Sequence, residues 1–267
     1  MSTLHLILLG IIQGITEFLP VSSSAHLILL PKIMGEADQG LLIDVGAHAG
    51  TLAAVILVFW RETWQLMQGS WDVLRRRDTG NARLTLYLAL ATIPGVAAGV
   101  ALISFEETLT RHIELIIISN IIWGVALWWF DKTGAQDKTI AQDLTWKRAL
   151  FVGSAQMIAL IPGTSRSGIT MTAGRYLGFS RIEAARLSLL LSIPITAGAV
   201  LAVLVKLVHN HPAPEEYRQF AIVAGLSFIT ALFAVVGLLK WLKRFNFTPF
   251  VVYRLGLAAV LIVWLYF

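Results

Sequence analysis

The chain has 267 residues, of which 57% are hydrophobic and 14% charged, and because soluble domains are about 25% charged, this composition predicts an integral membrane protein. The formal net charge is +5, but the basic residues gather at the ends of apolar runs, which favours topology and anionic-lipid contacts over binding of nucleic acid. The chain has no cysteine, which excludes disulfides, thiolate catalysis and cysteine-ligated metals.

Six apolar segments are long enough to cross a bilayer as helices, since roughly 20 residues span the hydrocarbon and lipid cannot satisfy an open sheet edge. In chain order these segments are 42–60, 84–105, 113–130, 184–207, 219–241 and 247–267. The predicted fold class is therefore an all-α integral membrane protein with six transmembrane helices.

Two further segments, 4–31 and 149–178, are broken near the middle, at Pro20 and at Pro162-Gly163. Proline disfavours the helical conformation in the residue before it. Each segment is therefore expected to form a re-entrant hairpin of two short helices that enters and leaves on one side of the membrane.

The loops fall into two groups by basic charge. The rich loops are 61–83, 131–148 and 240–244, whereas 31–40, 106–112 and 209–218 carry only Lys32, Arg111 and Arg218. Positive-inside bias puts the rich group in the cytoplasm. Both termini then lie outside, with 4–31 entering from the outer face and 149–178 from the inner face. Arg175 and the run Arg75-Arg76-Arg77 are interpreted as topology determinants, the run in a solvated loop.

This arrangement predicts a single membrane domain, 1–267, built from two pseudo-repeats at 1–130 and 149–267. Each consists of a hairpin followed by three crossings, and the odd number of crossings inverts the second copy. Inverted repeats place ligand sites near the midplane, where broken helices meet. Sequence similarity between the halves is limited to Gly10-x-x-Gln13 against Gly153-x-x-Gln156, each followed by a proline and a serine-rich turn.

The two interruptions carry polar motifs, Q-G-I-T-E-F-L-P-V-S-S-S-A-H from Gln13 to His26 and P-G-T-S-R-S-G-I-T from Pro162 to Thr170. Ionisable groups at membrane depth are costly and usually mark function. Ser22 or Ser23, and likewise Thr164 or Ser165, are placed to cap the helix that follows.

Capping does not require Glu17, His26 or Arg166. Helix N-termini together with a guanidinium suit a phosphate or diphosphate. Ser23 and His26 are three positions apart and share a helix face, a spacing that brings a hydroxyl within reach of a general base. Glu17 has three open roles: it orients the imidazole, holds a divalent metal, or acts as the base. An interhelical hydrogen bond is the alternative for His26.

Among the polar residues inside the predicted crossings, Asp44, His48 and Arg254 are considered individually. Asp44 and His48 are four positions apart on one face, which favours an interior helix–helix hydrogen bond over a place beside the site. Arg254 is expected to snorkel or to pair internally.

Together the motifs Q-x-x-x-E-F-L-P-V-S-S-x-x-H and P-G-x-S-R-S-G-x-T resemble those of the undecaprenyl-diphosphate phosphatase family, the bacitracin-resistance lipid phosphatases of bacterial inner membranes. The resemblance covers essentially the whole chain. It implies removal of the terminal phosphate of a C55 isoprenoid diphosphate on the periplasmic side, which regenerates the lipid carrier of cell-wall synthesis. It also implies a divalent cation, Mg²⁺ or Ca²⁺.

The resemblance assigns roles to particular residues. It implies catalytic roles for Glu17, Ser23, His26 and Arg166, with Glu17 also as metal ligand. The implied substrate-binding residues are Gln13, Ser22, Ser24, Ser165, Ser167 and Thr170. Two positions depart from the common family pattern: Gln13 cannot ionise and so cannot supply a charged ligand, and Ser24-Ala25 replaces a frequent Thr-Gly.

Two mechanisms and one other function stay open. Either Ser23 attacks the phosphorus with His26 as base, or a metal held by Glu17 activates water directly. The competing function is a polyprenyl-phosphate flippase or secondary transporter on the same scaffold. The other common lipid-phosphatase superfamily is excluded, because K-x6-R-P is missing and Thr172 stands where its histidine is needed. The expected partners are the lipid substrate and membrane lipid, with a homodimer left open.

Overall fold

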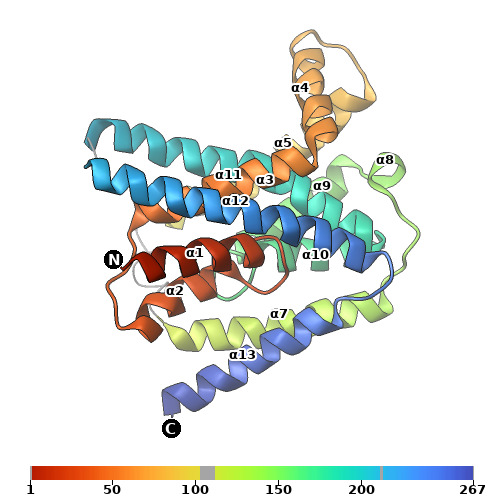
Figure 1. Ribbon diagram of the computed structural model, residues 1–267. Coiled ribbons are helices and arrows are strands. Elements are labelled where there is room, and N and C mark those ends of the chain that lie inside the picture. The colour runs from red at the N-terminus through yellow and green to blue at the C-terminus, as the bar shows by residue number, and fades with distance from the viewer. Residues whose placement is uncertain (1, 103–111, 211–212, 267) are drawn as a thin grey trace.

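The computed structural model describes residues 2–102, 112–210 and 213–266, with backbone only for 206–210. Figure 1 shows a bundle of helices, and the described residues contain no strand beyond one isolated bridge between Lys138 and Phe179. The loop charge at Arg111 and the end of the predicted crossing 84–105 lie outside the described residues.

All six predicted crossings are present as long apolar helices. They are α3 (Leu41–Val58), α5 (Gly80–Leu102), α7 (Ile113–Thr133), α11 (Arg181–Asn210), α12 (Pro214–Leu242) and α13 (Thr248–Tyr266). Each has the length and hydropathy of a membrane span. The prediction of a multi-pass, all-α membrane protein is confirmed.

Both broken segments form pairs of short helices. They are α1 (Thr3–Thr16) with α2 (Ser23–Met34), and α9 (Trp146–Ile158) with α10 (Arg166–Tyr176). In each pair the second helix turns back toward the side from which the first began (Figure 1). At 1.5 Å per residue, none of these helices reaches the roughly 30 Å of a hydrocarbon core.

Each proline ends the preceding helix about one turn before its own position. A proline ring clashes with the carbonyl of residue i−4 and offers no N–H to it. For Pro20 that residue is Thr16, and for Pro162 it is Ile158, which are the last residues of α1 and α9. The break is therefore a consequence of each proline, although the helix ends four residues before it.

The segment 61–83, counted among the basic loops, contains a helix, and the exposed Arg75-Arg76-Arg77 run follows it as a loop. Residues Trp60–Leu74 form α4, which projects from the bundle in Figure 1. Its exposed apolar side chains recur at helical spacing and are Trp60, Trp64, Met67, Trp71 and Leu74. A hydropathy search misses this helix, because its other face is polar and lowers the average over the window.

Close helix crossings in the two halves use glycine. α1 packs against α12, and a Cβ at Gly14 would lie 1.9 Å from Oγ1 of Thr230. α9 packs against α5, and a Cβ at Gly153 would lie 2.2 Å from the carbonyl oxygen of Ala91. Around these crossings, α3 contacts both α11 and α12, and α7 contacts α13.

Arg175 is not a topology determinant, contrary to the prediction. Its side chain is fully buried, and Nε donates to Oδ1 of Asp131 at 3.2 Å. Asp131 also accepts from Nε of Arg181 at 2.6 Å and from the backbone N–H of Phe247 at 3.3 Å. The carboxylate thus joins α7, α10, α11 and the start of α13, and Arg175 is part of the structural core.

Candidate active site

The first turn, between α1 and α2, carries Glu17 and Ser22. Glu17 is the C-cap of α1, with its N–H bonded to the Gln13 carbonyl at 3.0 Å, and its side chain is buried. Ser22 occupies the N-cap position of α2 with φ 74°, but it makes no side-chain capping bond. A serine in this left-handed region is strained, as residues at functional turns often are.

The second turn, between α9 and α10, repeats this geometry. Ser165 is the N-cap of α10 with φ 71°, and its hydroxyl accepts from the N–H of Gly168 at 3.1 Å. The predicted cap is confirmed for Ser165. In both turns the cap hydroxyl also meets the hydroxyl two positions on, at 3.2 Å between Ser22 and Ser24 and at 3.1 Å between Ser165 and Ser167. Ser23 and Arg166 are consequently the first residues of equivalent helices.

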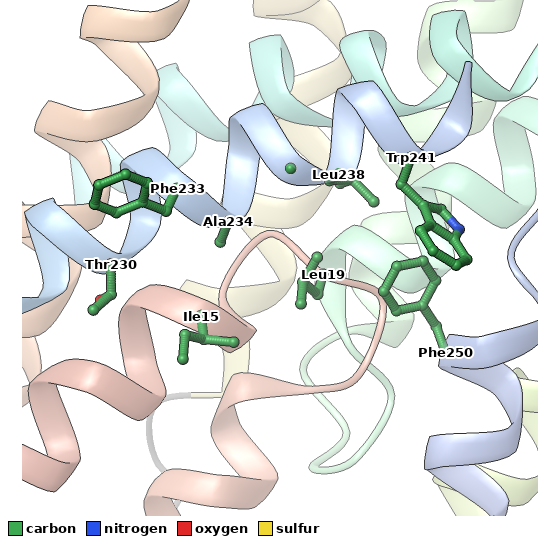
Figure 2. A pocket seen from close by; sticks show the side chains of 9 residues that line it. Ile15, Leu19, Thr230, Phe233, Ala234, Leu238, Trp241 and Phe250 are labelled. Carbon is green, nitrogen blue, oxygen red and sulfur yellow. The ribbon is translucent and has the colours of Figure 1, made fainter. Parts of the chain in front are cut away.

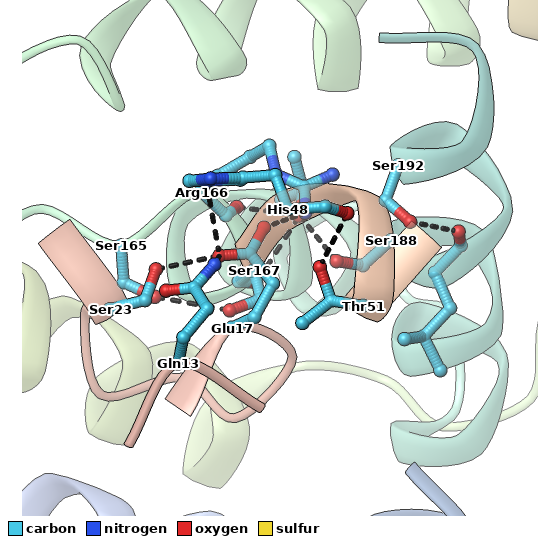
Figure 3. A network of polar contacts seen from close by, with 12 residues as sticks. Gln13, Glu17, Ser23, His48, Thr51, Ser165, Arg166, Ser167, Ser188 and Ser192 are labelled. Atoms are coloured by element: carbon cyan, nitrogen blue, oxygen red, sulfur yellow. Dashed lines mark hydrogen bonds and ion pairs between the residues drawn. The ribbon is translucent and has the colours of Figure 1, made fainter. Parts of the chain in front are cut away.

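Glu17 is the centre of the site (Figure 3). Its Oε1 accepts from Nη2 of Arg166 at 2.8 Å, and its Oε2 accepts from Oγ of Ser23 at 2.7 Å. Nε2 of Gln13 donates to the same Oε2 at 3.1 Å, and Nε2 of His48 lies 3.8 Å from it. Four elements, α1, α2, α3 and α10, thus supply partners to one carboxylate.

These contacts determine which hydrogen-bonding groups remain available to a ligand. A buried carboxylate is stable as an ion only when it is paired and hydrogen-bonded, and Arg166 with Ser23 and Gln13 meets that need. Because the Ser23 hydroxyl already donates its proton to Glu17, its oxygen lone pairs face away from the carboxylate. Within the described chain, the Arg166 guanidinium has no partner other than Glu17, so its remaining N–H groups are free to bind an anion.

His26 does not pair directly with Ser23. Its Nδ1–H donates to the Ser22 carbonyl at 2.7 Å, and its Nε2 is hydrogen-bonded to the hydroxyl of Tyr253 on α13. In the part of the chain that the structure describes, no hydrogen bond joins Ser23 and His26. The two share a helix face as predicted, but Glu17 lies closer to the hydroxyl. Sequence reasoning missed Tyr253, a tyrosine in an apolar span with no motif around it.

The predicted catalytic and substrate-binding residues fall into two sets, buried and accessible. Ser167 and Thr170 are buried, and their hydroxyls bond to the Leu19 carbonyl at 2.8 Å and to Oγ of Ser188 at 2.7 Å. Ser167 thus joins the two turns, and Thr170 joins α10 to α11. The side chains that remain at least partly accessible are Ser23, Ser24, His26 and Arg166. These four form the reachable surface of the site, with buried Glu17 and Gln13 behind them.

His48 lies beside the site rather than in a separate interior contact. Its Nδ1–H donates to the Asp44 carbonyl at 2.8 Å, which turns Nε2 toward Glu17. Asp44 accepts from Nε2 of Gln39 at 2.8 Å through its own side chain. His48 is therefore an additional cationic partner for Glu17 whenever it is protonated.

Arg254 links the backbones of both turns. Its side chain is fully buried on α13, and the guanidinium donates to the carbonyls of Pro20 at 3.4 Å, Gly163 at 2.9 Å and Thr164 at 2.9 Å. It also donates to the Ser119 carbonyl at 3.2 Å. Arg254 therefore pairs internally, as one of the two expectations stated, and its partners are backbone carbonyl oxygens. The carbonyls of Pro20, Gly163 and Thr164 lie in the turns outside the helices, and they would otherwise be unsatisfied in an apolar setting.

The donor set suits a hard cation with few protein ligands. No group of three or more histidine, aspartate or glutamate residues gathers at a metal-binding spacing in the described ranges. Glu17 supplies carboxylate oxygens, and Oε1 of Gln13 is buried and has no hydrogen-bond partner. Mg²⁺ in particular is often held by one or two carboxylates together with water and substrate phosphates. Glu17 and Gln13 therefore fit such an ion.

The fold and the site define a multi-pass α-helical membrane protein with a polar, cation-rich centre at the meeting point of two helical hairpins. Residues 6–260 match the family described as bacitracin resistance protein BacA, and the chain belongs to that family. It is 48% identical over 267 residues to the undecaprenyl-diphosphatase of Ruegeria pomeroyi, covering 98% of each chain. It is also 43% identical to the undecaprenyl-diphosphatase of Maricaulis maris, covering 98% of this chain and 99% of that protein.

Proposed function

We propose that this chain is an undecaprenyl-diphosphate phosphatase, which releases inorganic phosphate from the C55 diphosphate and leaves the monophosphate carrier. The relatives that carry this name align over nearly the whole chain. The observation that carries the proposal is the Ser23–Glu17–Arg166 contact, in which a hydroxyl, a proton acceptor and an anion-binding guanidinium meet at one carboxylate. Regeneration of the carrier supports cell-wall synthesis and bacitracin resistance.

In the proposed first step, Oγ of Ser23 attacks the terminal phosphorus while its proton passes to Oε2 of Glu17. The new O–P bond forms as the bond to the bridging oxygen breaks, and the lipid monophosphate leaves with that electron pair. Once Glu17 is protonated, its attraction for Arg166 weakens. The guanidinium then binds the phosphoryl oxygens, where charge develops in the transition state.

In the second step, water attacks the phosphorus of the phosphoserine and the P–Oγ bond breaks, so inorganic phosphate is released. The Ser23 oxygen leaves with that electron pair and takes back the proton held on Oε2 of Glu17. The pair of His26 and Tyr253 stands at the accessible edge of the site and accepts the proton of that water. In this mechanism Glu17 is the base of the first step, a role that the sequence had suggested for His26. His26 acts in the second step, the hydrolysis of the phosphoserine.

Mg²⁺ or Ca²⁺ is part of the proposal. Glu17 and Oε1 of Gln13 would hold the ion, which supplies positive charge against the diphosphate. A route without phosphoserine, in which water attacks directly, remains the mechanistic alternative. Trapping of labelled phosphate on Ser23 separates the two routes.

We also propose that the two hairpins are re-entrant and belong to inverted pseudo-repeats at 1–130 and 149–267. The packing of α1 against α12 and of α9 against α5 supports this. In both cases the first helix of a hairpin packs against the second crossing of the other pseudo-repeat. Four pairs of residues stand the same 143 positions apart: Gly10 and Gly153, Gln13 and Gln156, Ser22 and Ser165, Ser24 and Ser167. The site then opens to the periplasm from the bacterial inner membrane.

The decisive experiment is phosphate release from undecaprenyl diphosphate by the purified protein in detergent, with and without a chelator. A flippase or transporter would bind the lipid without releasing phosphate, so absence of release under all metal conditions would refute the phosphatase. A homodimer stays a prediction, which sedimentation of the detergent-solubilised protein tests.

A further inference from the structure

An apolar groove runs along α12 beside the end of α1 and the turn that follows it (Figure 2). Its volume is about 510 Å³, and its walls include Ile15, Leu19, Phe233, Gly237 and Phe250. Phe233 is 76% exposed, so the groove is open along its side. In a membrane protein this shape accepts an apolar chain from the surrounding lipid.

A second pocket, of about 720 Å³, lies where α7, α11, α12 and α13 meet at the end of the bundle that carries the basic loops. Three cationic side chains line it: Lys132, Arg181 and Arg244. Nε of Arg181 is bonded to Asp131. Within the described ranges, the side chains of Lys132 and Arg244 have no hydrogen bond or ion pair, although the backbone N–H of Arg244 donates to the Trp241 carbonyl. The pocket therefore has uncompensated positive charge.

Trp241 joins the groove to the pocket, because it lines both. Its Nε1–H donates to the Asn246 carbonyl at 3.0 Å, and its ring centroid lies 4.4 Å from that of Phe245. The indole is therefore held in place between an apolar channel and a cationic end. A molecule that matches both has an anionic head and an apolar chain.

We propose that this composite site binds one anionic glycerophospholipid of the cytoplasmic leaflet. The phosphate head group contacts Lys132 and Arg244, and one acyl chain passes Trp241 and lies in the groove beside Gly237. Basic pockets between helix ends on the cytoplasmic side suit such head groups. The open side of the groove favours a bulk membrane lipid over a rare one. The lining of this site includes none of Glu17, Ser23 and Arg166, and the proposal does not depend on the proposed phosphatase activity.

The head-group contact is tested with the double variant Lys132→Gln/Arg244→Gln. Neither side chain bonds to another described residue, so their replacement leaves the packing intact. Native mass spectrometry of the full chain, in micelles containing phosphatidylglycerol, measures the bound lipid. Affinity should fall on the order of 30-fold, the contribution of two basic residues near an anionic surface. The matched control, Arg76→Gln/Arg77→Gln, removes two charges from the same end and should bind as the wild type does.

The chain contact is tested with Gly237→Phe. A Cβ at Gly237 meets nothing within 4 Å, and the same holds at Gly225, elsewhere on α12 and outside the groove. Gly237→Phe should fill the groove and weaken phosphatidylglycerol binding, whereas Gly225→Phe should not. An unchanged melting temperature in each variant verifies the fold.

Four results would overturn the proposal. They are equal binding of phosphatidylcholine, complete competition by inorganic phosphate, tighter binding of a prenyl monophosphate, and unchanged phosphatidylglycerol binding in either test variant. If Gly237→Phe instead slows hydrolysis of the C55 diphosphate but not of a C15 diphosphate, and leaves phosphatidylglycerol binding unchanged, then the groove holds the substrate chain. Hydrolysis of both substrates by the wild type distinguishes that result from failure of the phosphatase proposal.

Discussion

Nη2 of Arg166 lies 2.8 Å from Oε1 of Glu17, although 149 positions separate the two residues in the chain. The contact connects the two hairpin turns, one contributing a carboxylate and the other a guanidinium. Truncating one member of a buried ion pair costs about 3–5 kcal/mol, because the other charge is left uncompensated. Substitutions at this pair therefore need conservative variants and a measurement of folding beside the measurement of rate.

Arg166→Lys should lose on the order of 10²-fold to 10³-fold in kcat, as expected when one preorganised donor is removed. A guanidinium binds two phosphoryl oxygens with a planar fork, whereas an ammonium is a compact point charge on a flexible stem. Phosphate release from undecaprenyl diphosphate measures the effect. The control is Arg218→Lys, since Arg218 is exposed and pairs only with Glu215 among the described residues. If the two substitutions change kcat equally, Arg166 acts only through its charge and does not bind two phosphoryl oxygens.

Ser23→Ala should lower the turnover rate by on the order of 10³-fold or more, which is comparable to the loss seen when an enzyme nucleophile is removed. Glu17→Gln should do the same by removing the proton acceptor of Ser23. Rapid acid quenching with a labelled terminal phosphate should recover label on Ser23 in the wild type and none in Ser23→Ala. Near-normal turnover of Ser23→Ala would instead favour direct attack by water.

Chelation should stop hydrolysis, and added Mg²⁺ or Ca²⁺ should restore it, because the diphosphate brings more negative charge than Arg166 alone balances. Gln13→Leu removes the amide oxygen and should raise the metal concentration needed for half-maximal rate. Full activity in excess chelator argues against any metal requirement, and an unchanged metal dependence of Gln13→Leu would remove that residue from the ligand set.

Single cysteines test the orientation, since the natural chain has none. Cysteines at the exposed positions Ala37 and Ala213 should react with an impermeant thiol reagent outside intact cells. Those at Asp78 and Asp137, also exposed, should react only after lysis. The opposite labelling would reverse the topology derived from loop charges and turn the site toward the cytoplasm.

Arg254→Met should lower the melting temperature of the purified protein strongly. The side chain keeps its length, but the turn carbonyls of Pro20, Gly163 and Thr164 lose their donor. Each buried polar group left unsatisfied costs about 1–3 kcal/mol. The exposed Arg218→Met provides the matched control. If both variants melt as the wild type does, the carbonyls must find other donors.

The sequence predicts the spans well because hydropathy and helix length are local properties. α3 was expected at 42–60 and forms at Leu41–Val58, and α7 was expected at 113–130 and forms at Ile113–Thr133. α4 was missed because only one of its faces is apolar. The hairpin breaks were located through Pro20 and Pro162, whose effect on the preceding turn also follows from local sterics.

The sequence predicted that certain polar residues would lie together, but it did not predict how they pair. Glu17, Ser23 and Arg166 stood out as polar residues in apolar surroundings, and the fold brings them together. That Ser23 bonds to Glu17 rather than to His26 depends on the direction of the chain through the first turn, which sequence spacing does not encode. Tyr253 contacts His26 from α13, and such a contact between distant helices leaves no signal in one sequence.

The position of Arg254 has a consequence for how the protein is made. Both turns are complete in sequence by Thr164, yet their carbonyls receive donors from a residue 90 positions further along. During synthesis the two hairpins must therefore wait for α13 before either turn reaches its final form. A chain that ends before α13 therefore contains every residue of the two motifs but lacks the donor that the carbonyls of both turns share.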